Sequence, residues 1–384
     1  MRKGWEYKKL GEVCTIKAGY TPKKNELSDN GAYPYYKVAD MNTLGNDVYL
    51  DITSSYKIDA NKLFPKGAIV FPKNGAAVST NKKRILKYDS IVDLNTGVAI
   101  FPKSINEKFA YYWFIDTDFK KYVRGGALPT LDIKSLKDKP FPSIDKSTQL
   151  AIVTELDKIN ELIRLKKEQL KDFDNLAQSL FYEMFGDPVE NEKGWEVKKL
   201  GEVCTDIKYG TSKPASEKGR YTYLRMCNLT TDGFLDLSNT KQIDIPDDEI
   251  EKCIVRYGDI LFNRTNSIEL VGKTCLFDKK EPMVIAGYII RVRLNDTLLP
   301  VVLARMFNLA SIKKLLRSMA KGAVNQANIN SKELASIRIP LPPLSLQRLF
   351  AQRIEQIERE KSEVQKSIQD LETLLASRMQ YWFE

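Results

Sequence analysis

The sequence predicts an α+β fold in which two mixed α/β domains alternate with two long helices. Three observations support this: a segment of eleven residues occurs twice, short strand-like runs follow each copy, and a heptad pattern closes each half. The copies are Gly4–Cys14 and Gly194–Cys204, and they differ only where Tyr7 is replaced by Val197. The chain is therefore an internal repeat with pseudo-two-fold symmetry, with domains expected at 1–146 and 187–342 and helices at 147–186 and 343–384.

Composition places the chain among globular proteins. Of its 384 residues, 43% are hydrophobic and 10% aromatic, and no apolar run approaches the roughly 20 residues that a membrane-spanning helix requires. The first residues lack the apolar stretch of a signal peptide, and the five cysteines show no Cys-x-x-Cys spacing. We therefore expect a cytoplasmic protein with reduced thiols and no membrane contact.

Histidine is absent, and the positive charge is concentrated in the two domains. The lack of histidine excludes His-based catalytic triads, the usual zinc sites and the commonest general base. Of the net charge of +10, residues 1–146 carry +9 and residues 187–340 carry +4, whereas the helical segments are slightly acidic. Two separate basic blocks favour a polyanionic partner, and a merely basic surface is the alternative.

Both domains show strand runs broken by Asn, Gly and Pro, followed by a helical pattern. In the first domain we expect strands near 33–38, 68–71 and 97–101, a helix near 109–115 and a loop at Gly125–Pro129. The second domain repeats this order more loosely. It predicts strands near 259–262 and 287–292, a helix near 302–316 and an extended entry to the last helix at Pro340–Leu344.

The two long helices carry matching heptad seams. Ser147 is the expected N-cap of the first, and Gly186-Asp187-Pro188 is expected to end it. An offset of 198 residues places each seam position of one helix on a seam position of the other, and it also matches Gln149 to Gln347. The central seam residues are Leu156, Ile159, Ile163, Leu170, Phe173, Ile354, Ile357, Val364, Ile368 and Leu371.

Neither helix can bury its apolar stripe alone, so we expect the two to pair as an antiparallel coiled coil. The alternative is that each helix packs only on its own domain. Lys166 and Lys361 interrupt the seam near the middle. Two explanations stay open for them: they fix the register, or their ammonium groups extend out of the seam into solvent.

Catalytic constellations are scarce. The nearest glycine-rich loop, Gly75–Lys82, lacks the second glycine of a phosphate-binding loop, and no amino-methyltransferase tetrapeptide of the Asn-Pro-Pro-Tyr type occurs. A nuclease-like pattern can be drawn through Asp187, Glu196 and Lys198. Its first-half counterpart has no upstream aspartate, so a structural role for this segment is preferred.

The richest polar stretch, Gly258–Ser267 followed by Lys273, is a strand that ends in Asn, Arg, Thr, Asn and Ser. Asn and Arg can read adenine and guanine edges, while Ser, Thr and Lys suit phosphate; a turn that satisfies its own backbone is the alternative. Its first-half counterpart is 68–75, followed by 81–84. The candidate DNA-binding residues are Lys73, Asn74, Lys82, Lys83, Arg84, Arg225, Asn228, Asn263, Arg264, Asn266 and Lys273.

These features together resemble the specificity subunit of type I DNA restriction-modification systems, over the whole length of the chain. The resemblance rests on the repeated Trp-Glu-x-Lys-Lys-Leu-Gly-Glu-Val segment and on further motifs. Those motifs are Asp93–Gly97, Gly126–Pro129, Leu180–Pro188, Gly258–Ser267 and Pro340–Ser345. One departure is Lys73-Asn74-Gly75, which stands in the first half where the second half has Asn-Arg-Thr.

The resemblance implies a non-catalytic subunit whose two target recognition domains each read one half of a bipartite site in double-stranded DNA. It also implies that the paired helices set the spacer between the half-sites. Two methyltransferase subunits would dock on this chain, restriction subunits would join them, and S-adenosylmethionine, ATP and magnesium would be bound by those partners. The competing functions are a stand-alone nuclease or methyltransferase and a scaffold that binds only protein.

Overall fold

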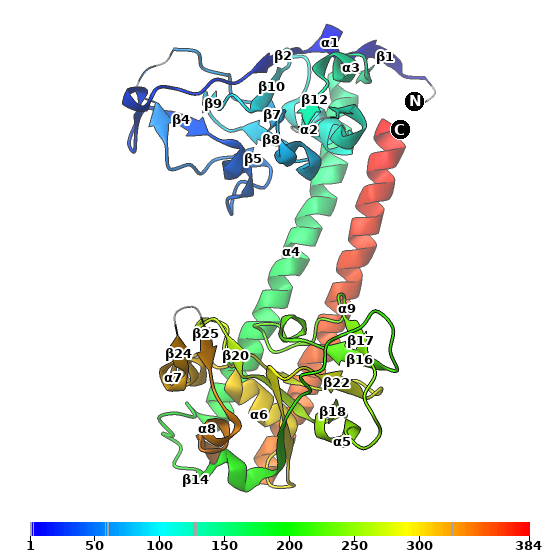
Figure 1. The fold of residues 1–384 in the computed structure, drawn as a ribbon. Helices are drawn as coiled ribbons and strands as arrows, with labels where there is room; N and C mark the ends of the chain where they lie inside the picture. Colours follow the sequence, from blue (N-terminus) through cyan, green and yellow to red (C-terminus); the bar gives the residue numbers. More distant parts are fainter. Residues whose placement is uncertain (1, 3, 58, 60, 126–128, 324–325) are drawn as a thin grey trace. The chain divides into compact units, whose positions relative to one another are not determined.

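The computed structural model describes the 384-residue chain except residues 1, 3, 58, 60, 126–128, 324 and 325 (Figure 1). The chain folds into two compact units, Met1–Lys167 with Lys366–Glu384, and Glu168–Gln365. Each unit therefore combines the bulk of one expected domain with part of each long helix. Three residues of the expected loop and family motif, Gly126, Ala127 and Leu128, lie outside the described residues.

Two small sheets form the first unit. Their strands are β2 (Thr15–Ala18), β3 (Leu27–Ser28), β4 (Tyr33–Tyr36), β5 (Tyr49–Leu50), β6 (Tyr56–Lys57), β7 (Ile69–Pro72), β8 (Arg84–Leu86), β9 (Ile91–Val92) and β10 (Thr96–Ile100). One sheet has the order β2-β10-β7-β8-β5 and the other β3-β6-β4-β9. Every residue of β7 is buried, as expected for a strand with a neighbour on each side and both faces covered.

Short helices and two ribbons complete this unit. The helices are α1 (Leu10–Val13), α2 (Glu107–Asp116) and α3 (Ile133–Lys137), and the ribbons pair β1 (Glu6–Lys9) with β13 (Pro140–Ser143) and β11 (Val123–Arg124) with β12 (Thr130–Leu131). Asn106 caps α2, since its side chain accepts from the amides of Lys108 and Phe109. The buried aromatic side chains of α2 then form much of the unit's core.

The second unit repeats this plan. Its main sheet has the order β15-β23-β19-β21, a second sheet is ordered β17-β16-β22-β18, and a third β20-β25-β24. The strands are β14 (Glu196–Lys199), β15 (Cys204–Tyr209), β16 (Tyr221–Leu224), β17 (Lys241–Ile243), β18 (Ile254–Val255), β19 (Ile260–Asn263), β20 (Thr265–Asn266), β21 (Thr274–Leu276), β22 (Met283–Ile285), β23 (Ile289–Leu294), β24 (Lys321–Ala323), β25 (Gln326–Asn328) and β26 (Arg338–Leu341), with β14 paired to β26.

One expected helix of this unit is broken. The single helix expected near 302–316 is two helices, α6 (Pro300–Phe307) and α7 (Ala310–Met319), which accompany the short α5 (Ile250–Cys253) and α8 (Ser331–Ala335). Asn308 ends α6, because its side-chain amide donates to the carbonyls of Ala304 and Thr274. Competition of this kind between an Asn side chain and the helical backbone favours termination.

The long helices are α4 (Lys146–Phe185) and α9 (Leu344–Phe383). The expected N-cap Ser147 is wrong: α4 begins one residue earlier, and the carboxylate of Asp145 accepts from the amide of Thr148 and from the hydroxyls of both Ser147 and Thr148. The same hydrogen bonds, first that from Ser147, lower the pKa of Asp145. At the other end, Gly186 adopts a φ of +77°, so the glycine ends the helix as predicted.

In the first unit the two helices pair antiparallel. Arg378 of α9 donates to Glu155 of α4, and Lys167 of α4 contacts Glu372 of α9 at 2.8 Å. A later residue of α4 thus meets an earlier residue of α9, which is the antiparallel arrangement. Ile152 and Leu156 of α4 enter the same core as Met379 and Phe383 of α9. The end of α9 thus completes the core of the first unit, which rules out the alternative that each helix packs only on its own domain.

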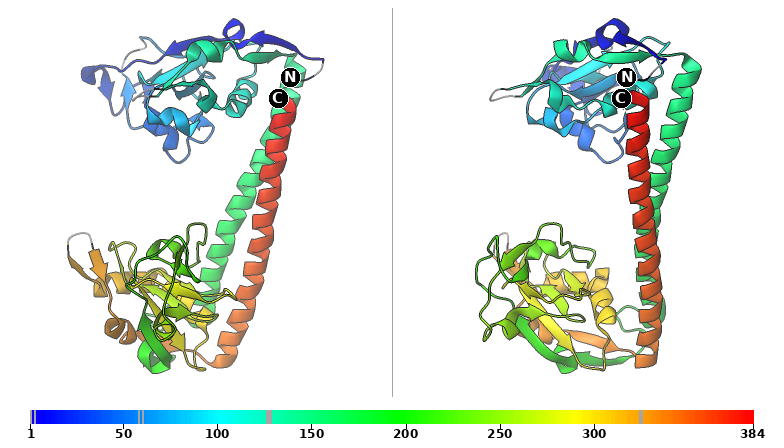
Figure 2. Two further views of the ribbon diagram at one scale, coloured as in Figure 1. Left: turned by 45° about the vertical axis from the view of Figure 1, so that its right-hand side comes forward. Right: turned by 90° about the vertical axis from the view of Figure 1, so that its right-hand side faces the viewer.

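The second unit contains the other half of the pair, and the left view of Figure 2 shows α4 and α9 side by side within it. Phe350 packs edge-to-face on Phe181 and Phe185, with ring centroids 5.6 Å and 5.0 Å apart. Lys361 is 6% exposed, and its ammonium lies 2.6 Å from the carboxylate of Asp174. Lys361 therefore stays inside the pair and meets an anion there, rather than extending into solvent.

The seam positions expected from the heptads are all buried or half-buried. Leu156, Ile159, Ile163, Ile354, Ile357, Val364 and Ile368 are buried, and Leu170, Phe173 and Leu371 are half-buried, as is Lys166. Of the half-buried residues, Phe173 packs against the core of the second unit.

A buried glutamine joins each helix to its domain. Gln149 accepts a hydrogen bond from the amide of Asn106 at 2.7 Å, and Gln347 accepts one from the amide of Leu299 at 2.8 Å. Both side-chain amides also donate to the carbonyl five residues earlier in the chain. The two glutamines are 1% and 0% exposed. The residues matched by the sequence offset therefore make the same buried hydrogen bonds in both units, and these bonds orient each domain on its helix.

Candidate nucleic-acid interface

The polar stretch that follows β19 leaves the main sheet of the second unit at Arg264. The amide of Arg264 donates to the carbonyl of Tyr288 at 3.0 Å, and its carbonyl accepts from the amide of Ile329 at 2.9 Å. Arg264 is half-buried, whereas Asn263 before it is 0% exposed. The backbone is therefore held on both sides at the point where the side chain reaches the surface.

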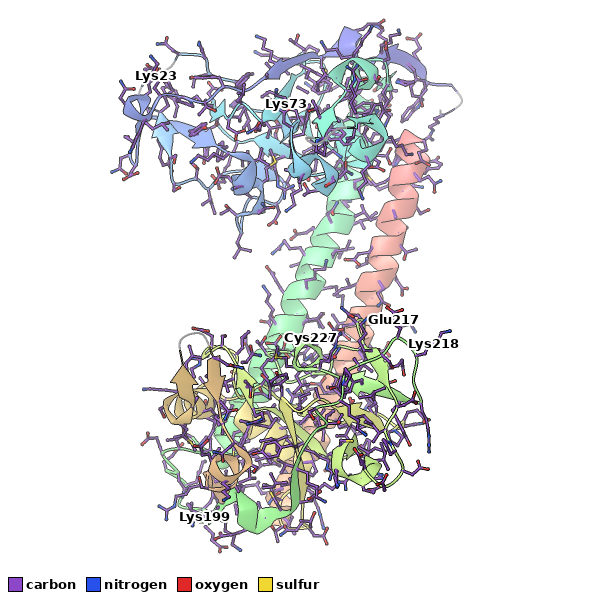
Figure 3. The ribbon with its side chains drawn as sticks, viewed as in Figure 1. Lys23, Lys73, Lys199, Glu217, Lys218 and Cys227 are labelled. Carbon is purple, nitrogen blue, oxygen red and sulfur yellow. The ribbon has the colours of Figure 1, made fainter. Side chains whose placement is uncertain are left out.

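Lys73 holds the corresponding place in the first unit, where Figure 3 labels it. Its amide donates to the carbonyl of Asn95 at 2.8 Å, and its carbonyl accepts from the amide of Leu131 at 2.9 Å. Lys73 follows β7 as Arg264 follows β19, and each strand occupies the same position in its sheet order. The two units thus offer a different cation from one shared backbone position.

The guanidinium of Arg264 lies over the ring of Tyr209, which is called the seat of Arg264 below. The guanidinium carbon lies 4.7 Å from the ring centroid of Tyr209, within the range of a cation–π contact. The phenol of Tyr209 is 2.9 Å from the hydroxyl of Ser331 and accepts from the Ser331 amide at 2.8 Å, which fixes the ring. Arg264 also donates to the carbonyl of Gly287 at 3.5 Å, a contact too long to hold it firmly.

In the first unit the position equivalent to Tyr209 is not aromatic. The strand pairing makes Ala18 the equivalent of Tyr209. Tyr209 pairs with Ile290, which pairs in turn with Phe262 of β19. Ala18 pairs with Gly97, which pairs in turn with Phe71 of β7. Alanine offers no ring to a cation. Asn74, the next residue, is half-buried, and its side-chain amide donates to the side chain of Asn95 at 3.4 Å.

Three candidate side chains of the second unit lie inside the protein, contrary to the expectation that they contact DNA. Asn263 donates to the carbonyl of Tyr288 at 3.2 Å and accepts from Asn266 at 2.9 Å. Lys273 is 8% exposed and donates to main-chain carbonyls, and burial lowers its pKa. Asn228 is 2% exposed and caps a short turn by accepting from the amide of Arg225.

The same correction applies to Lys83 in the first unit. The side chain is 0% exposed, donates to the carbonyl of Thr117 at 2.7 Å and to Asn81, and lies over the ring of Phe119. A side chain enclosed in this way cannot reach a phosphate without local unfolding. The sequence shows three adjacent basic residues but not which of their side chains the fold buries.

The remaining cations of the candidate set are half-buried and hydrogen-bonded to their own domain. Arg84 donates to three main-chain carbonyls, including that of Met41 at 2.8 Å, and Arg225 donates to the carbonyl of Asn239 at 2.7 Å. Lys82 contacts the side chain of Asn42. By these contacts Arg264 and Lys73 remain the strongest candidates for the interface, and Lys82 and Arg225 are further half-buried members of the candidate set.

Burial of Lys83 has a pH consequence, since desolvation lowers its pKa to about 7 in the folded protein. The unfolded chain then binds more protons between about pH 7 and 10, so this lysine makes the free energy of unfolding rise with pH across that window. We expect Lys83→Met to remove a slope of up to about 1.4 kcal/mol per pH unit.

Urea unfolding followed by tryptophan fluorescence measures this slope, because three of the four tryptophans, Trp5, Trp113 and Trp382, lie in the first unit. Lys82→Met, at the half-buried neighbouring position, is the matched control and should keep the wild-type slope. Parallel pH profiles for wild type and Lys83→Met would show that this ammonium is not desolvated.

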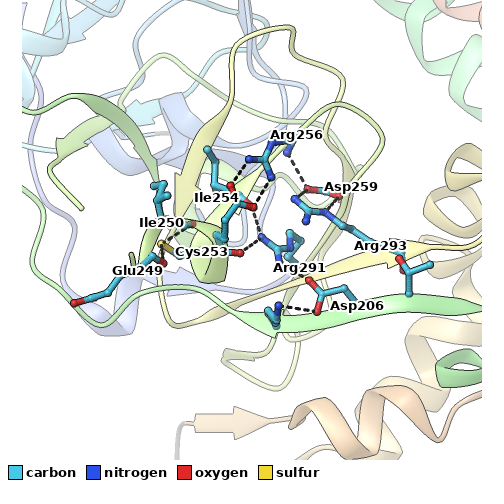
Figure 4. Close-up of polar contacts among 12 residues, drawn as sticks. Asp206, Glu249, Ile250, Cys253, Ile254, Arg256, Asp259, Arg291 and Arg293 are labelled. Carbon is cyan, nitrogen blue, oxygen red and sulfur yellow. Dashed lines mark hydrogen bonds and ion pairs between the residues drawn. The ribbon is translucent and has the colours of Figure 1, made fainter. Parts of the chain in front are cut away.

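A network of arginines and carboxylates supports the strand that carries Arg264 (Figure 4). Asp259, at the start of the polar stretch, is 4% exposed and receives two hydrogen bonds from Arg293, at 2.8 Å and 3.2 Å. Arg291, 0% exposed, donates to Asp206 and to the carbonyl of Ile254. These ion pairs tie β15, β19 and β23 together, so Asp259 has a structural role.

Sequence reasoning missed the tyrosines of this surface. Tyr209 and Tyr288 are 38% and 52% exposed, beside the strand end that carries Arg264. Tyr209 precedes Arg264 by more than fifty residues, and the two meet only because β15 and β19 both pair with β23. The sole signal was an aromatic residue next to lysine in Ile207-Lys208-Tyr209, which is too common to single out.

Within the described part of the chain, no group of three or more Cys, Asp or Glu side chains could hold a metal ion. A search of the described helices for one long and apolar enough to cross a membrane also found none.

Comparison with known proteins identifies the repeat. A family model described as "Type I restriction modification DNA specificity domain" matches residues 2–172 and again 192–373. The "Putative type I restriction enzyme MjaX specificity subunit" of Methanocaldococcus jannaschii is 30% identical over 47% of this chain and 44% of the relative. A second relative from that organism, the MjaIX specificity subunit, is 27% identical, and the match spans 55% of its length. These two matches thus span about half of each relative.

Other matches cover the whole chain. The "Type I restriction enzyme EcoKI specificity subunit" of Escherichia coli K12 is 21% identical over 95% of this chain and 84% of its own. The S subunit of a type I restriction-modification system from M. genitalium aligns over 99% of this chain and 96% of its own, with a TM-score of 0.52 and 16% identity. A chain from a structure described as "Structural basis underlying complex assembly and conformational transition of the type I R-M system" gives a TM-score of 0.64 at 19% identity, over 100% of this chain and 98% of its own.

The structural matches establish the fold, and the double match of the family model establishes the lineage of both halves. This chain therefore belongs to the family of type I restriction-modification DNA specificity proteins.

Proposed function

We propose that the chain is the non-catalytic, sequence-specific DNA-binding subunit of a type I restriction-modification complex. Each unit reads one half of a bipartite duplex site, and the helix pair fixes the spacer between the halves. The observation that carries the proposal is the shared strand end: equivalent backbone positions hold Arg264 in one unit and Lys73 in the other. Two domains built on one plan with different reading residues suit two different half-sites.

The partners and cofactors follow from the family. We propose that two methyltransferase subunits dock on this chain, one for each half of the repeat, and that restriction subunits join them in the cytoplasm. S-adenosylmethionine, ATP and magnesium are then bound by those partners and not by this chain. The excess of basic residues in both domains supports an approach to DNA by both units.

Methylome sequencing of cells with and without the gene tests this function directly. We expect one bipartite motif with an unspecified spacer to lose its methylation when the gene is absent. A second test exchanges the two domains for unrelated ones in the reconstituted complex. A protein-only scaffold would keep its site unchanged, and cleavage or methyl transfer by the purified chain alone would support a stand-alone enzyme.

Arg264→Ala should relax sequence discrimination in one half-site only. The expected loss is about 1–3 kcal/mol of discrimination at one base pair, because a bidentate arginine contact is removed while the first unit is untouched. Competition binding of the reconstituted complex to duplexes that differ in one half-site measures it. Equal losses at both half-sites would contradict the assignment of Arg264 to one reader.

A further inference from the structure

We propose that the half-site read by the second unit contains a guanine recognised by Arg264, and that Tyr209 is the residue that positions Arg264 for this contact. The inference rests on the proposed function and deepens it. It follows from three features of the structure: the seat of the guanidinium, the anchoring of that seat, and the lack of a seat at the equivalent position of the first unit.

The seat restricts the guanidinium at one face. The ring of Tyr209 lies under the guanidinium carbon at 4.7 Å, whereas the hydrogen bond to the Gly287 carbonyl is long at 3.5 Å. The Nε of Arg264 is buried and has no hydrogen-bond partner among the described residues. The ring therefore holds the group from one side, and the terminal Nη groups, not the buried Nε, are the donors left for an external acceptor.

The ring is itself fixed. Its hydroxyl contacts both the amide and the hydroxyl of Ser331, the first residue of α8, at 2.8 Å and 2.9 Å. Tyr209 is also the last residue of β15, which pairs with β23 over five positions. A guanidinium that is stacked on a fixed ring loses little conformational entropy when it binds. Its planar set of N–H donors therefore suits a planar target with two adjacent acceptors.

Guanine presents such a target. In the major groove its N7 and O6 are adjacent acceptors, and arginine spans them with two parallel hydrogen bonds. Phosphate also accepts paired hydrogen bonds from arginine, but a flexible lysine binds it as a point charge, so a phosphate contact does not require a donor held in a fixed plane. The first unit has Lys73 at the same backbone position, with Ala18 in place of the ring. The aromatic ring is thus found beside the arginine, and alanine takes its place beside the lysine.

The test measures binding of the reconstituted complex to duplexes that carry its methylome-defined motif, with each guanine of the second unit's half-site replaced in turn by 7-deazaguanine, which lacks the N7 acceptor. For the wild type we expect one position to weaken binding roughly 5- to 100-fold. In Tyr209→Leu, the penalty at that position should shrink by about two- to five-fold, whereas Tyr209→Phe, which keeps the ring, should restore most of it.

Controls separate this proposal from loss of folding and from failure of the proposed function. Tyr257→Leu changes a tyrosine of the same unit that is 75% exposed, and it should leave the 7-deazaguanine penalty intact. Discrimination in the first half-site should be unchanged in every variant. A wild-type complex without sequence-specific binding would refute the proposed function, whereas specific binding with no sensitive guanine, or an unchanged penalty in Tyr209→Leu, would refute the present inference alone.

Discussion

Replacing Phe350 with alanine should lower the free energy of unfolding of the second unit by about 3–5 kcal/mol. The side chain is 0% exposed and lies edge-to-face with Phe181 and Phe185, so its removal takes away both buried apolar area and two aromatic contacts. It joins the helix pair to the core that also contains α6. The loss therefore weakens the attachment of the helices to this unit as well as the unit itself.

Hydrogen–deuterium exchange of peptides from the second unit measures this loss locally, as an increase in exchange from globally opened molecules. Leu349→Ala is the matched control, because Leu349 is the preceding residue of the same helix and is 41% exposed. It should change stability by less than about 0.5 kcal/mol. Equal effects of the two substitutions would mean that α9 does not present Phe350 to the core.

Arg291→Met should have an effect of similar size, about 3–5 kcal/mol, for an electrostatic reason. Arg291 is 0% exposed, and its guanidinium donates to Asp206 and to the carbonyls of Glu251 and Ile254. Methionine fills a similar volume but leaves those acceptors without their donor. The equivalent position in the first unit is Val98, which shows that the sheet itself does not need a charge here.

The double variant Arg291→Met with Asp206→Leu distinguishes loss of charge pairing from loss of packing. Removing both partners should recover part of the stability lost in the single variant, since the carboxylate no longer lacks its cation. Urea unfolding combined with hydrogen exchange in the second unit provides the comparison. A double variant no better than Arg291→Met would place the cost in packing.

The repeat, the helices and their antiparallel pairing were predictable because each depends on local pattern. A heptad seam is readable from residue spacing, Gly186 is a helix-stop signal, and the match of Gln149 to Gln347 follows from the offset between the two halves. The N-cap was misplaced by two residues, since Asp145 and Ser147 are both good caps and the sequence does not rank them. The break at Asn308 was missed because it depends on a distant carbonyl, that of Thr274.

The candidate interface was only partly predictable. Residue type put forward Arg264 and Lys73 together with Lys83 and Lys273, which have the same chemistry but are buried, each one residue before a strand. Burial of these two lysines is decided by the packing around the start of the strand and by the carbonyls that accept from the ammonium group, and both depend on tertiary structure. The Tyr209 seat is of the same kind, because it exists only through the register of β15 on β23.

The ribbons that close the two domains have a consequence for how such a protein changes its target. Each domain enters and leaves through adjacent strands, with Glu6 opposite Ser143 in one and Glu196 opposite Leu341 in the other. Everything between the strands of a ribbon can be exchanged as a cassette while the remainder of the molecule keeps its path. Under the proposed function, exchange of one such cassette would replace the reader of one half-site in a single step.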